Sequence, residues 1–142
     1  MSFLITGRGG TIFTLSRNEF EVVSVLWDQG RPLTRAEIIR LSPDKSWKES
    51  TFHILLNSLI QKEAVQVVGF AQTGKRYGRT YSAIGSREDY TAMQLMKNAS
   101  DSKKHTDIPG VFAALIEMED IDSEILAKLE EIVERKKNEL SK

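Results

Sequence analysis

Residues 46–59 carry the side chains whose types and spacing best suit a chemical task. Apolar residues at i, i+3, i+4 and i+7 predict one buried helix face, formed by Phe52, Leu55, Leu56 and Leu59. The opposite face has no acid and consists of Ser50, Ile54, Asn57, Ser58 and Gln61, with Thr51 and His53 at its borders. Hydroxyl, amide and methyl groups of this kind can read base edges in a DNA groove. The alternative is an ordinary solvated face, which any amphipathic helix has.

A second candidate site follows this helix. No acid occurs at residues 64–87, and the basic side chains there are Lys75, Arg76, Arg79 and Arg87. Alternating residues from 65 to 70, a glycine-bounded turn over 73–78 and a return strand over 79–83 predict a β-hairpin with a basic tip. Such a tip suits a phosphate backbone. The alternative is a solvated turn whose charges prevent an edge strand from pairing.

Helix starts are predicted by three capping boxes, each with Ser or Thr followed three residues later by Glu. The boxes are Ser16–Glu19, Thr34–Glu37 and Ser46–Glu49. Gly30 is placed to end the first helix and Pro43 the second. Three capped helices followed by a basic hairpin give the order of a winged helix, with the third helix as reader and the hairpin as wing.

The C-terminal part is predicted to be helical, with Pro109 in the first turn of one helix and Asp122 capping the last. The helix after Pro109 is apolar on more sides than one neighbour can cover, so we expect it to pack against a second copy of the chain. The residues predicted for this dimerisation are Val111, Phe112, Leu115, Ile116, Ile125, Leu129, Ile132 and Val133. The alternative is that this part folds back on the winged helix. A two-fold dimer would match a palindromic DNA site.

The predicted fold is therefore mostly α with a small β-hairpin, a winged helix-turn-helix followed by a helical dimerisation region. We expect a tail at residues 1–14, a winged-helix domain at 15–90 and a helical domain at 91–142. Residues 1–90 hold 12 Lys and Arg against 9 Asp and Glu, whereas residues 91–142 hold 8 against 11. The excess of basic residues in the first part suggests that this part meets an anionic partner.

Composition excludes several classes of function. With 40% hydrophobic and 28% charged residues, the 142-residue chain is typical of a soluble globular protein. It has no cysteine, which excludes disulfides, thiolate metal sites and a cysteine nucleophile. No apolar run approaches the roughly 18 residues of a membrane span, and no signal peptide is recognisable, so we expect a cytoplasmic location and no membrane partner. His53 and His105 lack carboxylate companions at ligand spacing, and we see no nucleophile–base pair. We therefore expect no metal site and no cofactor, and we do not expect the chain to be an enzyme.

Residues throughout the chain match a known pattern. They are Leu15, Glu19, Val22, Leu26, Trp27 and Asp28 in the first helix; Ser50-Thr51-Phe52, Leu55-Leu56-Asn57 and Leu59 in the third; Gln61-Lys62-Glu63-Ala64-Val65 and Tyr81-Ser82-Ala83 around the wing; and Asp107-Ile108 through Ile116, then Asp122 onward, in the tail. On these residues the chain resembles the penicillinase-repressor family of bacterial transcriptional repressors, from about residue 14 to residue 140.

The resemblance implies a homodimeric repressor that binds a palindromic operator in double-stranded DNA and is removed by an inducing signal. By position, the base readers it implies are Ser50, Thr51, His53, Ile54, Asn57 and Ser58. The backbone contacts it implies are Lys48, Lys75, Arg76 and Arg79. The alternative function is a winged-helix module for protein–protein contact without specific DNA binding, which the zero net charge favours.

The chain departs from the family pattern in ways that bear on the operator and on induction. Many members have arginine at the positions of His53 and Ser58, so the resemblance does not imply the usual operator sequence. The wing is longer than in the penicillinase repressors. Ala114-Leu115 replaces the Asn-Phe pair that is cleaved in antibiotic-responsive members, so the resemblance does not imply induction by that cleavage. The cysteine motif of the copper-responsive branch is absent.

Overall fold

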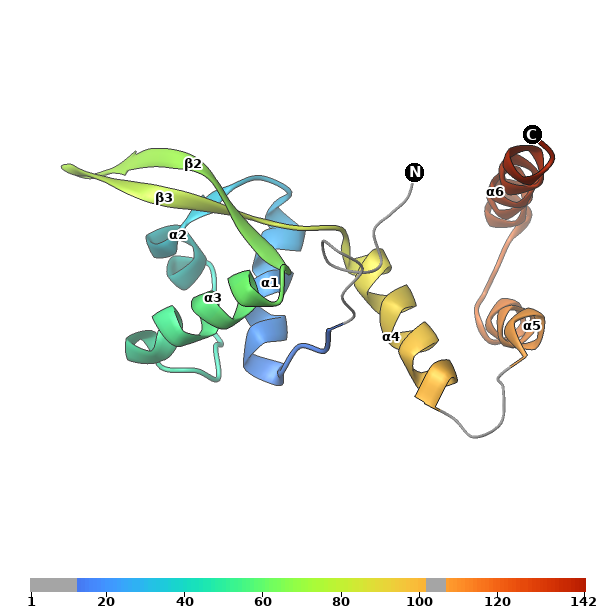
Figure 1. Cartoon of the computed structure of the whole chain (residues 1–142), viewed down its shortest axis with the longest axis horizontal. Coiled ribbons are helices and arrows are strands. Elements are labelled where there is room, and N and C mark those ends of the chain that lie inside the picture. Colours follow the sequence, from blue (N-terminus) through green and yellow to red (C-terminus); the bar gives the residue numbers. More distant parts are fainter. Residues whose placement is uncertain (1–12, 102–106) are drawn as a thin grey trace. The chain divides into compact units, whose positions relative to one another are not determined.

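The computed structural model describes residues 13–101 and 107–142. Residues 1–12 of the predicted tail, and His105, lie outside the described residues. The chain forms two compact units, Met1–Asp101 and Ser102–Lys142 (Figure 1). The first unit extends to Asp101, beyond the boundary predicted after residue 90. The helix over residues 87–101 is tied to it by hydrogen bonds from Gln94 and Lys97 to residues 13 and 14, and Met93 of this helix is buried.

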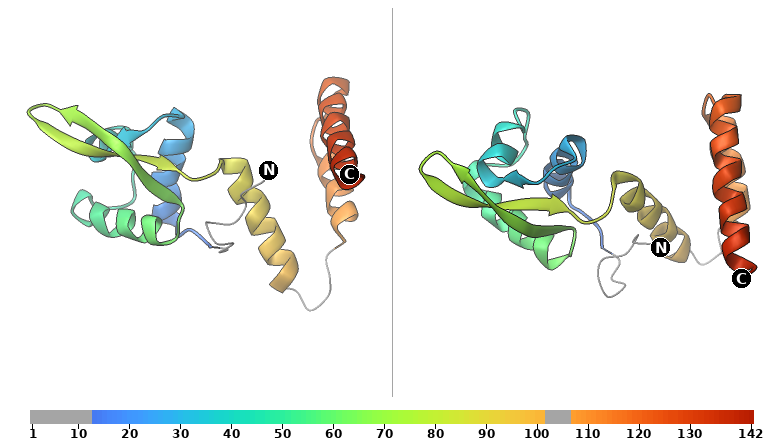
Figure 2. Two further views of the ribbon diagram at one scale, coloured as in Figure 1. Left: turned by 45° about the horizontal axis from the view of Figure 1, so that its top comes forward. Right: turned by 90° about the horizontal axis from the view of Figure 1, so that it is seen from above.

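The order of elements is that of a winged helix followed by further helices. The first unit contains α1 (Arg17–Gln29), β1 (Leu33–Thr34), α2 (Arg35–Arg40), α3 (Phe52–Gln61), β2 (Val65–Thr73), β3 (Arg76–Ala83) and α4 (Arg87–Asp101). The second unit contains α5 (Ile108–Met118) and α6 (Ser123–Leu140). The three strands form one antiparallel sheet in the order β1-β3-β2. The predicted fold class is confirmed, and Figure 2 shows the β2–β3 hairpin extending beyond the first three helices.

Two of the three predicted capping boxes are present. At the start of α1, the Ser16 hydroxyl accepts from the Glu19 N–H at 3.2 Å, and the Glu19 carboxylate accepts from the Ser16 N–H at 2.8 Å. Thr34 and Glu37 form the same box at the start of α2. These reciprocal bonds satisfy backbone donors that an α-helix leaves unpaired.

The third predicted box is wrong. The Ser46 N–H and hydroxyl donate to the carboxylate of Glu21 in α1, at 3.0 and 2.6 Å. The Ser46 N–H, which would have to donate to Glu49 in a capping box, is therefore already bound to Glu21. The chain instead forms a short 3-10 helix at Glu49–Thr51, and α3 begins at Phe52.

The apolar face predicted for the third helix is buried, as expected. Phe52, Leu56 and Leu59 lie in the core, and Leu55 packs against it partly buried. The core residues around them come from α1, β1, α2, the loop before α3, and the sheet: Val22, Val23, Leu26, Leu33, Ile38, Trp47, Ala64, Val65 and Tyr81. This core fixes which face of α3 remains outside.

The wing strands run closer to the tip than the sequence predicts. Thr73 pairs with Arg76, so only Gly74 and Lys75 form the turn, and the predicted turn over 73–78 is wrong. Gly74 has φ +65°, a value that glycine adopts at little cost at the first position of a two-residue hairpin turn. Gly78 is a strand residue paired with Ala71. A register shift between Val67 and Gly69 marks an irregularity in β2.

The end of α3 stores backbone strain that can be tested. Glu63 has φ +61°, which is costly for a residue with a Cβ, and the Ala64 N–H donates to the Leu59 carbonyl across the turn. We expect Glu63→Gly to raise the free energy of unfolding by about 0.5–1 kcal/mol, measured by urea denaturation. Glu63→Ala keeps the strain, so it is the control. An equal gain in both variants would assign the effect to the side chain.

The second unit consists of two helices with predicted starts. Pro109 lies in the first turn of α5, and the Asp122 carboxylate accepts from the Ile125 N–H at 2.9 Å at the start of α6. Neither helix has a buried residue. The exposed apolar side chains of the second unit include Phe112, Leu115, Ile116, Ile125, Leu129, Ile132 and Val133. Two helices that bury so little have few apolar contacts with which to stabilise themselves.

Candidate nucleic-acid interface

The outer side of α3 and the 3-10 helix before it present one continuous run of predicted base readers. Its members, which we call the reading face, are Ser50, Thr51, His53, Ile54 and Asn57, and all are exposed. Ile54 is 59% exposed although it is apolar. The Thr51 hydroxyl donates to the Lys48 carbonyl at 2.7 Å. The reading face thus offers imidazole, amide, hydroxyl and methyl groups on one helix side.

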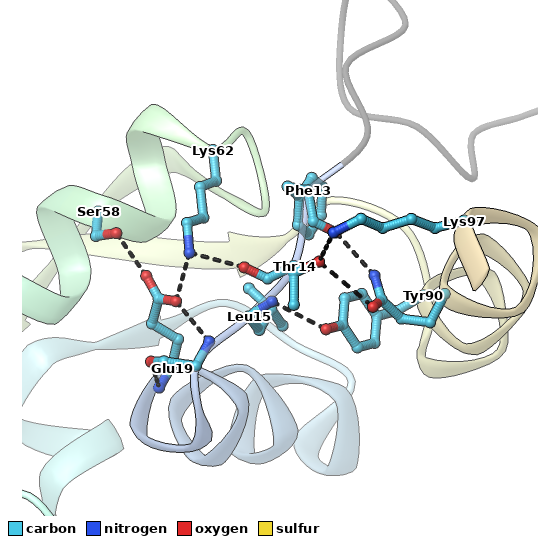
Figure 3. A network of polar contacts seen from close by, with 10 residues as sticks. Phe13, Thr14, Leu15, Glu19, Ser58, Lys62, Tyr90 and Lys97 are labelled. Atoms are coloured by element: carbon cyan, nitrogen blue, oxygen red, sulfur yellow. Dashed lines mark hydrogen bonds and ion pairs between the residues drawn. The ribbon is translucent and has the colours of Figure 1, made fainter. Parts of the chain in front are cut away.

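Ser58 does not belong to this face. Its hydroxyl donates to the carboxylate of Glu19 in α1 and is half-buried, because α3 turns this position toward α1. We therefore remove Ser58 from the predicted readers. Figure 3 shows its side chain pointing at Glu19.

Glu19 is a residue whose role at this site was missed. Glu19 is 3% exposed, and its carboxylate also accepts from Lys62 Nζ at 2.6 Å, so it holds the C-terminal end of α3. Burial raises the pKa of Glu19. The bonds from Lys62, the Ser16 backbone and Ser58 lower it by more than burial raises it, so the net pKa lies below the ordinary value. In the sequence, Glu19 stands out as a capping residue and as part of the family pattern, but neither signal indicates its bonds to Ser58 and Lys62.

Residues 13–15 connect α3 with α4. Lys62 Nζ donates to the Thr14 carbonyl at 2.8 Å, and the Leu15 N–H donates to the Tyr90 hydroxyl at 2.9 Å. Lys97 Nζ donates to the Thr14 hydroxyl at 2.7 Å (Figure 3). The segment thus hydrogen-bonds both the end of α3 and α4, which leads toward the second unit.

The basic side chains predicted to contact the DNA backbone are exposed. Lys48 precedes the 3-10 helix, Lys75 lies in the hairpin turn, and Arg76 and Arg79 lie on β3. Arg87, the last basic residue of the acid-free stretch at 64–87, lies away from the hairpin tip. It pairs with Asp28 at 2.9 Å and lies over the Trp27 ring, at the base of the wing. The cations near the tip remain candidates for phosphate contact.

Other kinds of site receive little support from the described residues. Among residues 13–101 and 107–142, no three His, Cys, Asp or Glu side chains are grouped so that they could hold a metal ion. In the same part of the chain, no helix is long and apolar enough to cross a membrane.

Two comparisons with known proteins bear on this surface. The family described as Penicillinase repressor has a model that matches residues 15–135. The chain is also 30% identical over 92 residues to a Latilactobacillus sakei protein described as "Uncharacterized 16.5 kDa protein in ptsI 3'region". The matched region covers 62% of this chain and 53% of that protein, so the chain spans about half the length of this relative.

Proposed function

Because the chain belongs to the penicillinase repressor family, we propose that it represses transcription as a homodimer bound to a palindromic operator in double-stranded DNA. In this proposal the reading face of α3 enters the major groove and the wing rests on the phosphate backbone. The observation that carries the proposal is the exposed, acid-free reading face on the same unit as a cationic wing.

The chemistry of the two surfaces supports separate tasks for them. Lys75, Arg76 and Arg79 contribute charge, which attracts any duplex and is weakened by salt. Asn57 and His53 offer hydrogen-bonding groups, and Ile54 offers apolar contact to a thymine methyl group. Positioning by cations and reading by short side chains together distinguish an operator from other DNA.

The homodimer is supported by the second unit. The side chains predicted for dimerisation lie on two helices without a buried residue, and most of them are exposed. A second copy would cover this apolar surface and repeat the reading face by two-fold symmetry. Half-sites about one turn of DNA apart, or a multiple of it, would then match the dimer.

The proposed function is tested by an anisotropy titration against a duplex from upstream of the protein's own gene, beside a random duplex, at two salt concentrations. We expect tight binding to the upstream duplex that survives the higher salt far better than binding to random duplex. Equal binding to both, lost together as salt rises, would contradict specific repression. That outcome would favour the protein–protein module instead.

One pair of variants assigns roles to the two surfaces. Asn57→Ala should lower operator affinity by about 1–3 kcal/mol and leave random-duplex affinity nearly unchanged, because it removes only a base contact. Lys75→Ala should weaken binding to both duplexes and reduce the salt slope by about one, because it removes a phosphate contact. Both are measured in the titration above. If Asn57→Ala lowers both affinities equally, Asn57 is not a base reader.

A further inference from the structure

The wing carries two exposed aromatic side chains that the roles assigned above leave unused. Phe70 in β2 is 71% exposed and Tyr77 in β3 is 75% exposed. Aromatic rings carry a large apolar surface, so rings this open to water in an ordered strand suggest a binding contact.

Strand register places both rings on one face of the wing. Phe70 is opposite Arg79, and Gln72 is opposite Tyr77. Directly opposed residues share a face and side chains alternate along a strand, so Phe70, Tyr77 and Arg79 lie on the same face. Tyr81, two residues beyond Arg79, is buried on this face. The two rings therefore lie on the core-facing side of the sheet, in the part of the wing that extends beyond the core.

The surroundings of this face are cationic. A hollow between the wing and the start of α2 has eight lining residues, three of them arginines and none an acid: Thr34, Arg35, Ala36, Arg76, Tyr77, Gly78, Arg79 and Tyr81. Lys75 in the turn adds another cation. An apolar protein partner gains nothing from this charge, whereas a polyanion with apolar sugar edges matches both features.

We propose that Phe70 and Tyr77 pack against the sugar and base edges of a DNA minor groove, while Arg79 and Lys75 hold the flanking phosphates. This inference rests on the proposed function and adds a minor-groove contact to it. The wing then contributes an apolar, salt-independent share of the affinity. It also becomes sensitive to groove shape, since proteins of several kinds place apolar side chains and arginines in the minor groove.

Threonine variants test the two rings without removing the β-propensity of their strands. Phe70→Thr and Tyr77→Thr should each weaken binding to the upstream duplex about tenfold and leave the salt slope unchanged, because an apolar contact releases no counterions. Ala71→Thr introduces the same residue on the opposite face of the wing, opposite Gly78, and should bind like the native chain. Circular dichroism and the melting temperature check that each variant folds.

Inosine identifies the groove. It lacks the guanine N2 amino group in the minor groove and keeps the major-groove acceptors. Inosine in the flanks of the upstream duplex should tighten binding by the native chain and leave the Phe70→Thr, Tyr77→Thr double variant unaffected. An equal response of both proteins overturns the minor-groove contact.

The outcomes separate this inference from the proposed function. If the native chain does not prefer the upstream duplex, the proposed function fails. If it does, but both threonine variants bind as tightly as the native chain, only the wing inference fails. A reduced salt slope in the threonine variants also overturns the inference, because the rings would then act only by placing the cations.

Discussion

Glu19→Ala is expected to lower the free energy of unfolding by about 2–4 kcal/mol, because several charge-assisted hydrogen bonds are lost together. The buried carboxylate accepts from the Ser16 N–H, the Ser58 hydroxyl and Lys62. The alanine variant loses half of the α1 capping box and both bonds to α3. Lys62 is partly exposed and can return to water, which limits the loss. Urea denaturation followed by circular dichroism measures the effect.

Glu21→Ala is the matched control for this prediction. Glu21 lies in the same helix and binds Ser46, but the contact is at the surface. Its removal should cost clearly less than the removal of Glu19, because water replaces surface hydrogen bonds at little cost. A loss at Glu19 no larger than that at Glu21 would contradict the structural role of the buried carboxylate.

The pH dependence of stability provides a second measurement on Glu19. Its pKa is lowered in the folded protein, so the carboxylate stabilises the fold above the ordinary value of 4.5, and this stabilisation is lost as the pH falls through the lower folded pKa. Glu19→Gln keeps the size of the side chain and removes the charge. The difference in stability between the native chain and this variant should be full at pH 7 and shrink below about pH 4.5. A difference that does not change with pH would exclude the ionised carboxylate as its cause.

Local patterns could be predicted from the sequence because their determinants are close together in the chain. The boxes at Ser16–Glu19 and Thr34–Glu37, and the buried face of Phe52, Leu56 and Leu59, depend on residues within one or two helical turns. Helix periodicity and cap spacing fix such features before the chain is folded.

Long-range partners could not be predicted in the same way. Glu19 binds residues 39 and 43 positions away, and only the packing of α1 against α3 brings them together. Ser46 has a good local capping pattern, but its N–H, which the box would pair with Glu49, donates instead to Glu21, 25 positions earlier. The same cause removes Ser58 from the reading face: the helix period places it near the outer side, and its hydrogen bond turns it inward. Strand residues 73 and 76–78 were predicted as turn because glycines at a hairpin tip also suit an open turn.

Ile132→Glu is expected to convert a dimer into a monomer and to weaken operator binding by about 100-fold or more, since two linked half-site contacts become separate. The prediction rests on the proposed homodimer. Ile132 lies on α6 and is 51% exposed within its own chain, so a glutamate there is compatible with the helix and stays in water in the monomer. In a dimer the same charge would be buried against apolar side chains without a partner. Sedimentation equilibrium and the DNA titration measure the two effects.

Asn138→Glu is the control for this variant, because it adds the same charge to the same helix on a different side from Ile132. It should remain dimeric and bind DNA like the native chain. A native chain that sediments as a monomer, or an Ile132→Glu variant that remains a dimer, would contradict the predicted interface. If Ile132→Glu dissociates the dimer but keeps its operator affinity, each subunit reads its half-site independently. The dimer interface on α5 and α6 would then be supported, but operator binding would not depend on dimerisation.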